Sequence, residues 1–207
     1  MTESQIDEPT RWERRKESTY RRLLMVGEEL FRTQGFDATT VEEIAVAADV
    51  AKGTFFNYFT SKEKLLGELL YLRTEPLLAS PPGDQASAVE RIWLLLQDVR
   101  RELLPYAHLF QRMLAYAMSH PKPEPPPESH RTLGQAVAHL VREGQRQGSF
   151  RVEGDPDVAG ALIATYFFRL LLLECVCDSI GKFCWADQMR AGLDLVYNGL
   201  IVDKKES

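Results

Sequence analysis

Apolar residues recur along this chain at intervals of three and four positions, the spacing that gathers them on one face of an α-helix. Glycines and prolines stand mostly between these periodic segments, where they interrupt helices. No segment shows the alternating pattern of a β-strand, and no internal repeat is evident. The sequence therefore predicts an all-α fold of about nine helices. They are expected over residues 10–34, 40–48, 52–58, 60–78, 85–102, 105–118, 128–147, 155–178 and 184–202.

Capping signals mark the beginnings of several of these helices. Thr10, Thr40 and Thr60 each precede a glutamate by three positions, which is the arrangement of a capping box. Gly35 is expected to end the first helix in a left-handed conformation. Asp155, followed directly by a proline, predicts a further helix start. Closely spaced starts in the first third of the chain indicate a small domain of short helices.

Breaks in the pattern divide the chain. We expect an N-terminal three-helix domain with a helix-turn-helix over residues 10–64 and a larger helical domain over residues 65–207. A proline-proline-glycine sequence at residues 81–83 interrupts the helices near this division. Residues 121–127 contain five prolines, so they are expected to form a stiff, extended connection. A connecting loop is favoured there over a protein-binding motif.

The composition is that of an ordinary globular protein, with 44% hydrophobic and 27% charged residues. No apolar run is judged to reach the roughly 18 residues that a membrane span requires. The first residues are polar and acidic, unlike those of a signal peptide. We therefore expect a cytoplasmic protein without membrane association.

The three cysteines have no recognisable metal-ligand spacing. Cys175 and Cys177 are two positions apart, so on a helix they point to different faces. Together with Cys184 they are expected to be small buried apolar residues, with a redox-sensing role left open. No metal or other cofactor is expected.

The distribution of charge is more informative than its sum. The formal net charge of −5 does not by itself suggest a nucleic-acid-binding protein. Residues 11–22, however, hold six arginines and lysines against two glutamates, and Lys52, Lys62 and Lys64 form a second basic group. Phosphate contacts are local, because salt screens charges separated by more than about 10 Å.

Residues 40–59 meet the requirements of a helix-turn-helix. Ala45 supplies the small residue that two crossing helices need where they touch. Asp49 stands where the turn requires a positive φ angle, which aspartate tolerates better than most residues. Phe55 and Phe59 are expected to anchor the second helix from one side.

The other side chains of the second helix should then face outward. These are Lys52, Thr54, Asn57 and Tyr58. A cation, two hydrogen-bonding side chains and a phenol can contact phosphates and base edges, and the second helix of such a motif enters the major groove. The alternative is a helical hairpin with a polar outer face.

Three runs between Leu30 and Leu66 are distinctive in combination: FRTQGFDATTV, IAVAADV and KGTFFNYFTSKEKL. They resemble the TetR family of bacterial transcriptional regulators almost residue for residue. The resemblance covers 37 of the 207 residues. The remaining chain is similar to that family only in length and helical layout.

The resemblance implies a set of residues that contact DNA. Thr40 and Lys62 would reach phosphates from the starts of two helices, and Gly53 would let the backbone approach the groove. The complete implied set is Thr40, Lys52, Gly53, Thr54, Phe56, Asn57, Tyr58 and Lys62. Phe56 departs from the family, where tyrosine is frequent, so its ring is expected to pack against a sugar or a thymine methyl. Asp49 also departs, since relatives often carry glycine there.

The resemblance further implies a homodimer through the last two helices, about residues 155–178 and 184–202. The sequence agrees, because residues 155–178 are apolar on more sides than one packing face requires. A dimer would present two recognition helices to a palindromic double-stranded DNA operator.

A small-molecule effector, of unknown identity, is implied as the signal that releases the protein from DNA. The residues expected to line its site are Trp93, Phe110, Met113, Tyr116, Tyr166, Phe167 and Arg169, with His108, His139 and Glu174 as polar anchors. Arg169 lies in so apolar a helix that it needs a partner. Glu174, an acid of another chain or an anionic ligand could each serve.

These features favour a DNA-binding transcriptional regulator, with repression as the usual mode of the family. We expect no enzyme, because the sequence has no glycine-rich phosphate loop, nucleophile elbow or matched carboxylate pair. The alternative is a helical ligand-binding or adaptor protein without DNA binding. Phe56 leaves this alternative open, because a phenyl ring cannot donate a hydrogen bond to phosphate.

Overall fold

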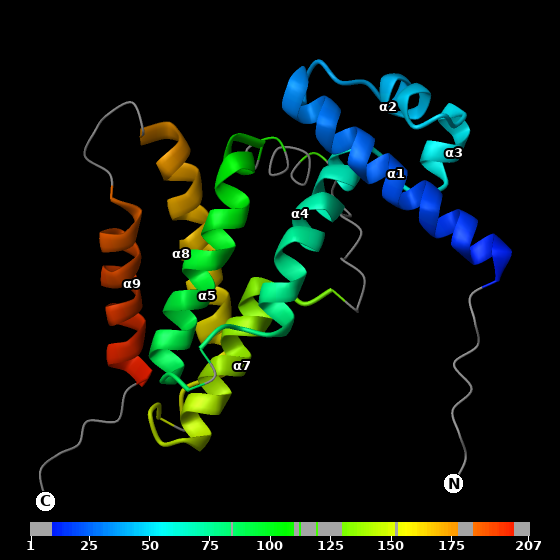
Figure 1. The fold of residues 1–207 in the computed structure, drawn as a ribbon. Coiled ribbons are helices and arrows are strands. Elements are labelled where there is room, and N and C mark those ends of the chain that lie inside the picture. The colour runs from blue at the N-terminus through cyan, green and yellow to red at the C-terminus, as the bar shows by residue number, and fades with distance from the viewer. Residues whose placement is uncertain are drawn as a thin grey trace, which may run out of the picture. The chain divides into compact units, whose positions relative to one another are not determined.

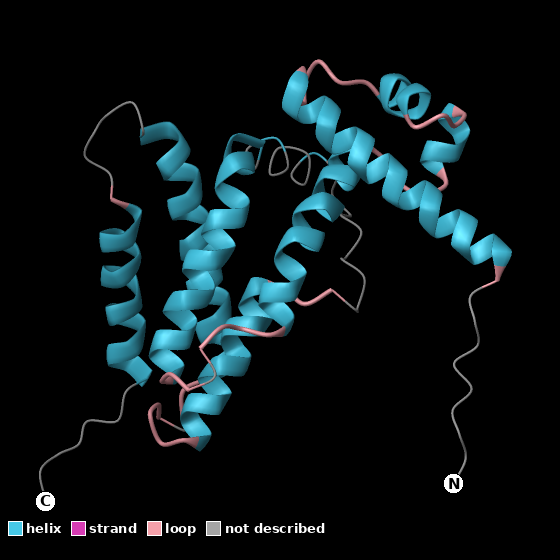
Figure 2. Cartoon of the chain, viewed as in Figure 1, coloured by secondary structure: helices cyan, strands magenta, loops and turns pink. Residues whose placement is uncertain are grey.

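The computed structural model describes residues 10–83, 85–109, 112, 119, 130–151, 153–177 and 184–200. These residues form helices, turns and loops and include no strand, which confirms the predicted all-α fold (Figure 2). The helices are α1 (Arg11–Thr33), α2 (Val41–Ala47), α3 (Lys52–Phe56), α4 (Lys62–Ala79), α5 (Ala88–Leu103), the 3-10 helix η1 (Leu104–Tyr106), α7 (Leu133–Arg146), α8 (Pro156–Cys177) and α9 (Trp185–Leu200) (Figure 1).

Some sequence-based predictions fall outside the described residues. The helix expected over residues 105–118 is described chiefly at its beginning, as η1 and three helical residues that follow it. The proline-rich segment 121–127 lies outside. So do the side chains of Cys175 and Cys177 and three of the expected effector contacts, Phe110, Met113 and Tyr116. Cys184 is exposed, so the prediction that it is buried was wrong.

The chain divides into two compact units, Met1–Leu69 and Leu70–Ser207. The first unit contains α1, α2, α3 and the beginning of α4. Its core consists of buried apolar side chains from all four helices and the loop after α1, because each helix keeps one apolar face. They are Leu23, Leu24, Phe31, Phe36, Ile44, Ala45, Ala48, Phe55, Phe59, Leu65, Leu66 and Leu69.

Helix α1 begins and ends as predicted. Thr10 accepts a hydrogen bond from the Glu13 backbone N–H, and the Glu13 carboxylate accepts one from the Thr10 N–H, so the capping box is confirmed. Gly35 has φ +87°, which confirms the left-handed end of the helix. Phe36 then folds back on Phe31 with 4.9 Å between ring centroids.

The start of α4 differs from the prediction. The sequence favoured Thr60 as the cap, but α4 begins at Lys62, and the Ser61 hydroxyl accepts the Lys64 backbone N–H at 3.3 Å. The prediction was wrong by one residue, because serine and threonine both cap helices and stand side by side here.

The second unit is built on the close packing of α7 against α8. Their contact depends on small residues, since a Cβ atom on Gly160 would collide with the Gly134 carbonyl oxygen. Helix α5 is joined to α7 by a nearly buried ion pair in which both oxygens of Glu143 accept from Arg91, at 2.7 and 2.8 Å. At the start of α8, the Asp155 carboxylate accepts the backbone N–H groups of the first turn, which confirms the predicted start.

Helix α8 corrects one expectation from composition. Residues Pro156–Glu174 have a mean hydropathy of 1.5 and are long enough to cross a membrane by length and composition alone, and a third of this stretch is buried within the chain. The expectation that no segment reaches that length was therefore wrong. The apolar surface left uncovered includes Val158 and Leu162, which are 54% and 56% exposed.

Candidate nucleic-acid interface

A tight turn between α2 and α3 fixes the geometry of the motif. Asp49 has φ +51°, and among the described residues it is the one non-glycine residue in the left-handed region, as predicted. The turn is closed by the Val50 N–H, which donates to the Ala45 carbonyl at 2.9 Å. Ala45 and Ala48 are buried. The predicted helix-turn-helix is present.

Aromatic packing holds α3 in place. Phe55 and Phe59 are buried, with 5.7 Å between their ring centroids, as the sequence predicted. The Tyr20 ring of α1 stacks on Phe59 at 5.6 Å and meets Tyr58 at 6.4 Å. The Tyr20 hydroxyl donates to Glu68 at 2.5 Å, and burial, together with this carboxylate, raises the pKa of Tyr20. Tyr20 supports α3, a role that its place in the apolar pattern did not reveal.

Most of the predicted DNA-contacting residues at α2 and α3 are exposed. Thr40, Lys52, Gly53, Phe56 and Asn57 are exposed, and Thr54 and Tyr58 are half-buried. The Phe56 ring remains 46% exposed, although its neighbour Phe55 meets it edge-on at 5.5 Å. A phenyl ring held in water beside polar residues is suited to an apolar partner such as a thymine methyl.

Lys52 carries the positive charge at the beginning of α3. Its ammonium forms an ion pair with Glu42 of α2, and both side chains are about half exposed. The hydrogen bond from Lys52 lowers the pKa of Glu42. The ammonium also lies 6.0 Å from the centroid of the Phe56 ring. An exposed ion pair of this kind is weak, so Lys52 can exchange its partner for a phosphate or a base at little cost.

Gly53 leaves the surface of α3 open. A Cβ atom built on it would meet no other atom of the chain within 4 Å. Packing within the protein therefore does not require glycine at this position. The missing side chain instead exposes the backbone next to Lys52.

Thr40 is engaged as the cap of α2. Its hydroxyl accepts the Glu43 backbone N–H at 3.2 Å and donates to the Glu43 carboxylate at 2.9 Å, which confirms the second capping box. The hydrogen bond from the Thr40 backbone N–H is the main cause of the lowered pKa of Glu43. The Gln34 amide donates a further hydrogen bond to Glu43 at 3.3 Å, which the sequence pattern did not predict.

Lys62 is directed toward the loop between α1 and α2. Its ammonium donates to the backbone carbonyls of Phe36 and Thr39, at 2.7 and 2.9 Å, and lies 4.5 Å from the centroid of the Phe36 ring. The sequence had suggested a phosphate contact. The observed bonds instead hold the segment that ends at Thr40.

The expected effector contacts fall in different places in the second unit. Trp93 of α5 and Phe167 of α8 meet through Trp185 of α9, at centroid distances of 5.8 and 6.0 Å. Trp185 was not among the predicted effector contacts; it is buried, and its indole N–H is unpaired among the described residues. The Arg100 guanidinium lies 5.1 Å from the centre of the Trp185 ring.

The polar candidates do not converge on this cluster. Glu174 had been considered as a partner for Arg169, but it pairs with Arg100. Arg169 is exposed and lies 6.0 Å from the Tyr166 ring, and the Tyr166 hydroxyl donates to the Gln188 carbonyl of α9 at 3.1 Å. His108 is exposed.

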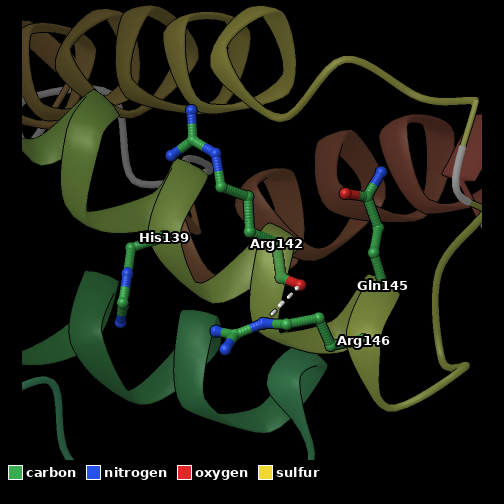
Figure 3. Close-up of a pocket in the computed structure, with 4 residues that line it drawn as sticks. All are labelled: His139, Arg142, Gln145 and Arg146. Carbon is green, nitrogen blue, oxygen red and sulfur yellow. Dashed lines mark hydrogen bonds between the residues drawn. The ribbon is translucent and has the colours of Figure 1, made fainter.

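His139 lies on a separate surface hollow of α7. The residues that line it are His139, Arg142, Gln145 and Arg146 (Figure 3). Partial burial, together with the nearby positive charge of Arg131, lowers the pKa of His139. Arg142 is already paired with Asp157 of α8. Among the described residues no group of acidic, histidine and cysteine side chains is arranged to hold a metal ion.

Comparisons with known proteins agree with this geometry. Residues 23–69 match the model of the bacterial regulatory proteins of the tetR family. The HTH-type transcriptional regulator UidR of Escherichia coli K12 is 26% identical over 157 residues, which are 74% of this chain and 76% of UidR. TcmR of Streptomyces glaucescens, also an HTH-type transcriptional regulator, is 41% identical over 64 residues, or 31% of this chain and 28% of TcmR.

Solved structures extend the likeness beyond the first unit. FadR of Thermus thermophilus, a TetR family transcriptional repressor crystallised with lauroyl-CoA, has a TM-score of 0.67 and 25% identity over 91% of this chain and 98% of FadR. GusR of Salmonella enterica has a TM-score of 0.63 and 19% identity over 94% of this chain and 100% of GusR, which shows a shared fold. The first unit therefore carries a DNA-binding domain of the tetR family, and the chain is similar over most of its length to transcriptional regulators of that family.

Proposed function

We propose that this protein binds a palindromic operator as a homodimer, represses transcription from it, and is released when a small molecule binds. In this proposal residues 10–64 bind DNA, and residues 65–207 bind the effector and dimerise. A regulator of this kind acts in the cytoplasm. One observation carries the DNA-binding step: the turn at Asp49 and the buried Phe55 and Phe59 hold α3 so that its polar residues remain exposed.

The proposed DNA contacts have different parts to play. Lys52 and Thr54 stand in the first turn of α3, the part of a recognition helix that meets base edges. Asn57 and Tyr58 follow at its end, where a hydrogen-bonding side chain can reach a base or a phosphate. Gly53 and Phe56 offer close approach and an apolar contact. Thr40 meets phosphate at the start of α2, supported from behind by Lys62.

The dimer is supported by apolar surface on the last two helices. Val158 and Leu162 are four residues apart on α8, so they share one face of that helix, and both are more than half exposed. Leu195 on α9 is 77% exposed. Large apolar side chains grouped in this way mark an interaction surface, and a second copy of the same helices matches it in a symmetric dimer.

The effector proposal rests on the cluster around Trp185. Trp93, Phe167 and Trp185 gather apolar surface, and the indole N–H of Trp185, which has no partner among the described residues, offers a hydrogen bond to an acceptor. FadR of Thermus thermophilus was crystallised with lauroyl-CoA, a molecule with both an apolar chain and polar groups. We infer an effector of the same general kind, with an apolar body and at least one hydrogen-bond acceptor.

The decisive experiment selects bound fragments from the genome of the host with the purified full-length protein. We expect enrichment of a short inverted repeat, and an affinity reduced by roughly 1–3 kcal/mol in Lys52→Ala if Lys52 reads a base. Recovery of no fragment above background would reject DNA binding and leave a ligand-binding or adaptor role. Effector candidates are then screened for release of the protein from that DNA, since a true inducer binds the free protein more tightly than the complex.

A further inference from the structure

The first two turns of α1 bury nothing. Residues 11–18 are all exposed, although a helix of a folded domain normally keeps one face against the core. Trp12 is 68% exposed and has the Lys16 ammonium 5.4 Å from its ring centroid. Trp12 and Lys16 therefore offer an apolar ring and a cation side by side to a partner.

The charge of this surface is strongly positive and largely uncompensated. Residues 11–22 carry six basic side chains and two glutamates. Both glutamates are already engaged, Glu13 with the Thr10 cap and Glu17 with Arg21 at 2.6 Å. Arg11, Arg14 and Arg15 have no side-chain partner among the described residues. Like charges so close together repel one another, so the surface is suited to a polyanion.

The position of these turns within the first unit relates them to α3. The ring contacts of Tyr20 with Tyr58 and Phe59 mark the level at which α1 passes the end of α3. At 1.5 Å per residue, Arg11 lies roughly 13 Å further along the helix axis. Figure 1 shows the first turns of α1 extending past α3. The basic turns therefore lie on the same unit as α3, at a distance shorter than one turn of a duplex.

We propose that residues 11–22 of α1 form a second DNA-binding surface, which contacts the phosphate backbone of the duplex flanking the base pairs that α3 reads. The inference rests on the proposed DNA-binding function and extends it to a site outside the helix-turn-helix. Duplex DNA carries one negative charge per about 1.7 Å of its axis, so a basic segment of this length meets several phosphates. These contacts add affinity without adding sequence specificity.

The test uses the full-length protein and the duplex selected from the genome as described above. The triple variant Arg11→Ala, Arg14→Ala, Arg15→Ala removes three unpartnered charges and keeps good helix formers, so circular dichroism and thermal unfolding should be unchanged. Affinity is measured by fluorescence anisotropy from 50 to 300 mM salt. Each lost phosphate contact should reduce the slope of log K against log salt by about 0.9 per protomer. Affinity at moderate salt should fall on the order of tenfold or more.

A control variant and a longer duplex test whether the loss of affinity is specific to the first turns of α1. Arg14→Ala should reduce the slope, whereas Arg32→Ala, also on α1 but in its last turn and paired with Glu29 at 2.6 Å, should not. The wild-type protein should gain affinity when the duplex is lengthened on both sides of the repeat, and the triple variant should not.

The outcomes separate this inference from the proposed function. If the wild-type protein binds no duplex, the proposed function fails. If it binds and the triple variant has the same slope and the same response to duplex length, the second surface is rejected while the proposed function stands. Loss of binding to anionic phospholipid vesicles in the variant, with DNA binding unchanged, would also overturn the inference and identify a membrane as the partner.

Discussion

The two units of this chain arrange their chemistry in different ways. In the first, the residues proposed to contact DNA lie between Thr40 and Tyr58, on two short helices that are joined by the turn at Asp49. In the second, the cluster around Trp185 draws on α5, α8 and α9, which are far apart in the sequence. Local signals therefore explain the cap and the turn of the DNA-binding surface, with support from Tyr20 and Lys62, whereas the effector site depends entirely on how distant helices pack.

The largest effects should come from the buried aromatic side chain at the centre of each unit. Phe55 and Phe167 are both fully buried, so replacing either by alanine should cost about 3–5 kcal/mol of unfolding free energy. Phe55→Ala should abolish DNA binding and leave the unfolding transition of the second unit, followed by the fluorescence of its buried tryptophan, in place. Phe167→Ala should lower that transition. A single transition lowered equally by both variants would contradict the distinction between the units.

The next effect concerns dimerisation. Leu162→Glu places a charge on the exposed apolar face of α8, which the proposed dimer buries. We expect a monomer by analytical ultracentrifugation and an operator affinity reduced on the order of a hundredfold, because the second recognition helix is no longer tethered to the first. Leu72→Glu, at an exposed leucine of α4, is the control and should remain dimeric. A dimeric Leu162→Glu protein would show that the contact lies elsewhere.

A smaller effect tests the role of Lys62. Lys62→Met removes the ammonium that bonds the carbonyls of Phe36 and Thr39, and it should lower the stability of the first unit by about 2 kcal/mol. Operator affinity should fall because Thr40 is less well held, while the salt slope stays the same. Measuring operator affinity at several salt concentrations tests this role of Lys62. A slope of log K against log salt that is reduced by about 0.9 would show a direct phosphate contact.

The smallest change in stability is expected for Gly53→Ala. The added methyl group meets no other atom of the chain and favours the helix, so the free energy of unfolding should stay the same or rise by about 0.5–1 kcal/mol. Operator affinity should nevertheless fall, because the methyl group stands where the backbone approaches DNA. Denaturant unfolding and anisotropy of the same preparation measure both quantities. Unchanged affinity would place Gly53 outside the contact.

Much of the first unit could be predicted from sequence because its signals are local. The capping boxes at Thr10 and Thr40 and the positive φ of Asp49 each depend on residues a few positions apart. The prediction of Thr60 as the cap of α4 was wrong because Thr60 and Ser61 offer the same capping chemistry. Only the fold selects between these two neighbouring residues.

Local capping and turn signals could not predict contacts between residues that are far apart in the sequence. Nothing near Lys62 in the sequence indicates that its ammonium bonds carbonyls 23 and 26 positions earlier. Glu174 was considered as the partner of Arg169, five positions away, yet it pairs with Arg100, 74 positions away. The indole of Trp185 was missed because its neighbours come from α5 and α8.

The setting of Trp185 gives the protein a built-in optical signal. Its indole is buried, with the Arg100 guanidinium over one face and the ring of Trp93 close by, so its emission depends on the spacing of α5 and α9. Trp12, in contrast, is in water and reports on its own surroundings at the beginning of α1. Replacing Trp12 by phenylalanine leaves the emission of the second unit alone. Compounds can then be screened on the unlabelled protein by a change in the colour of its fluorescence, before any operator has been found.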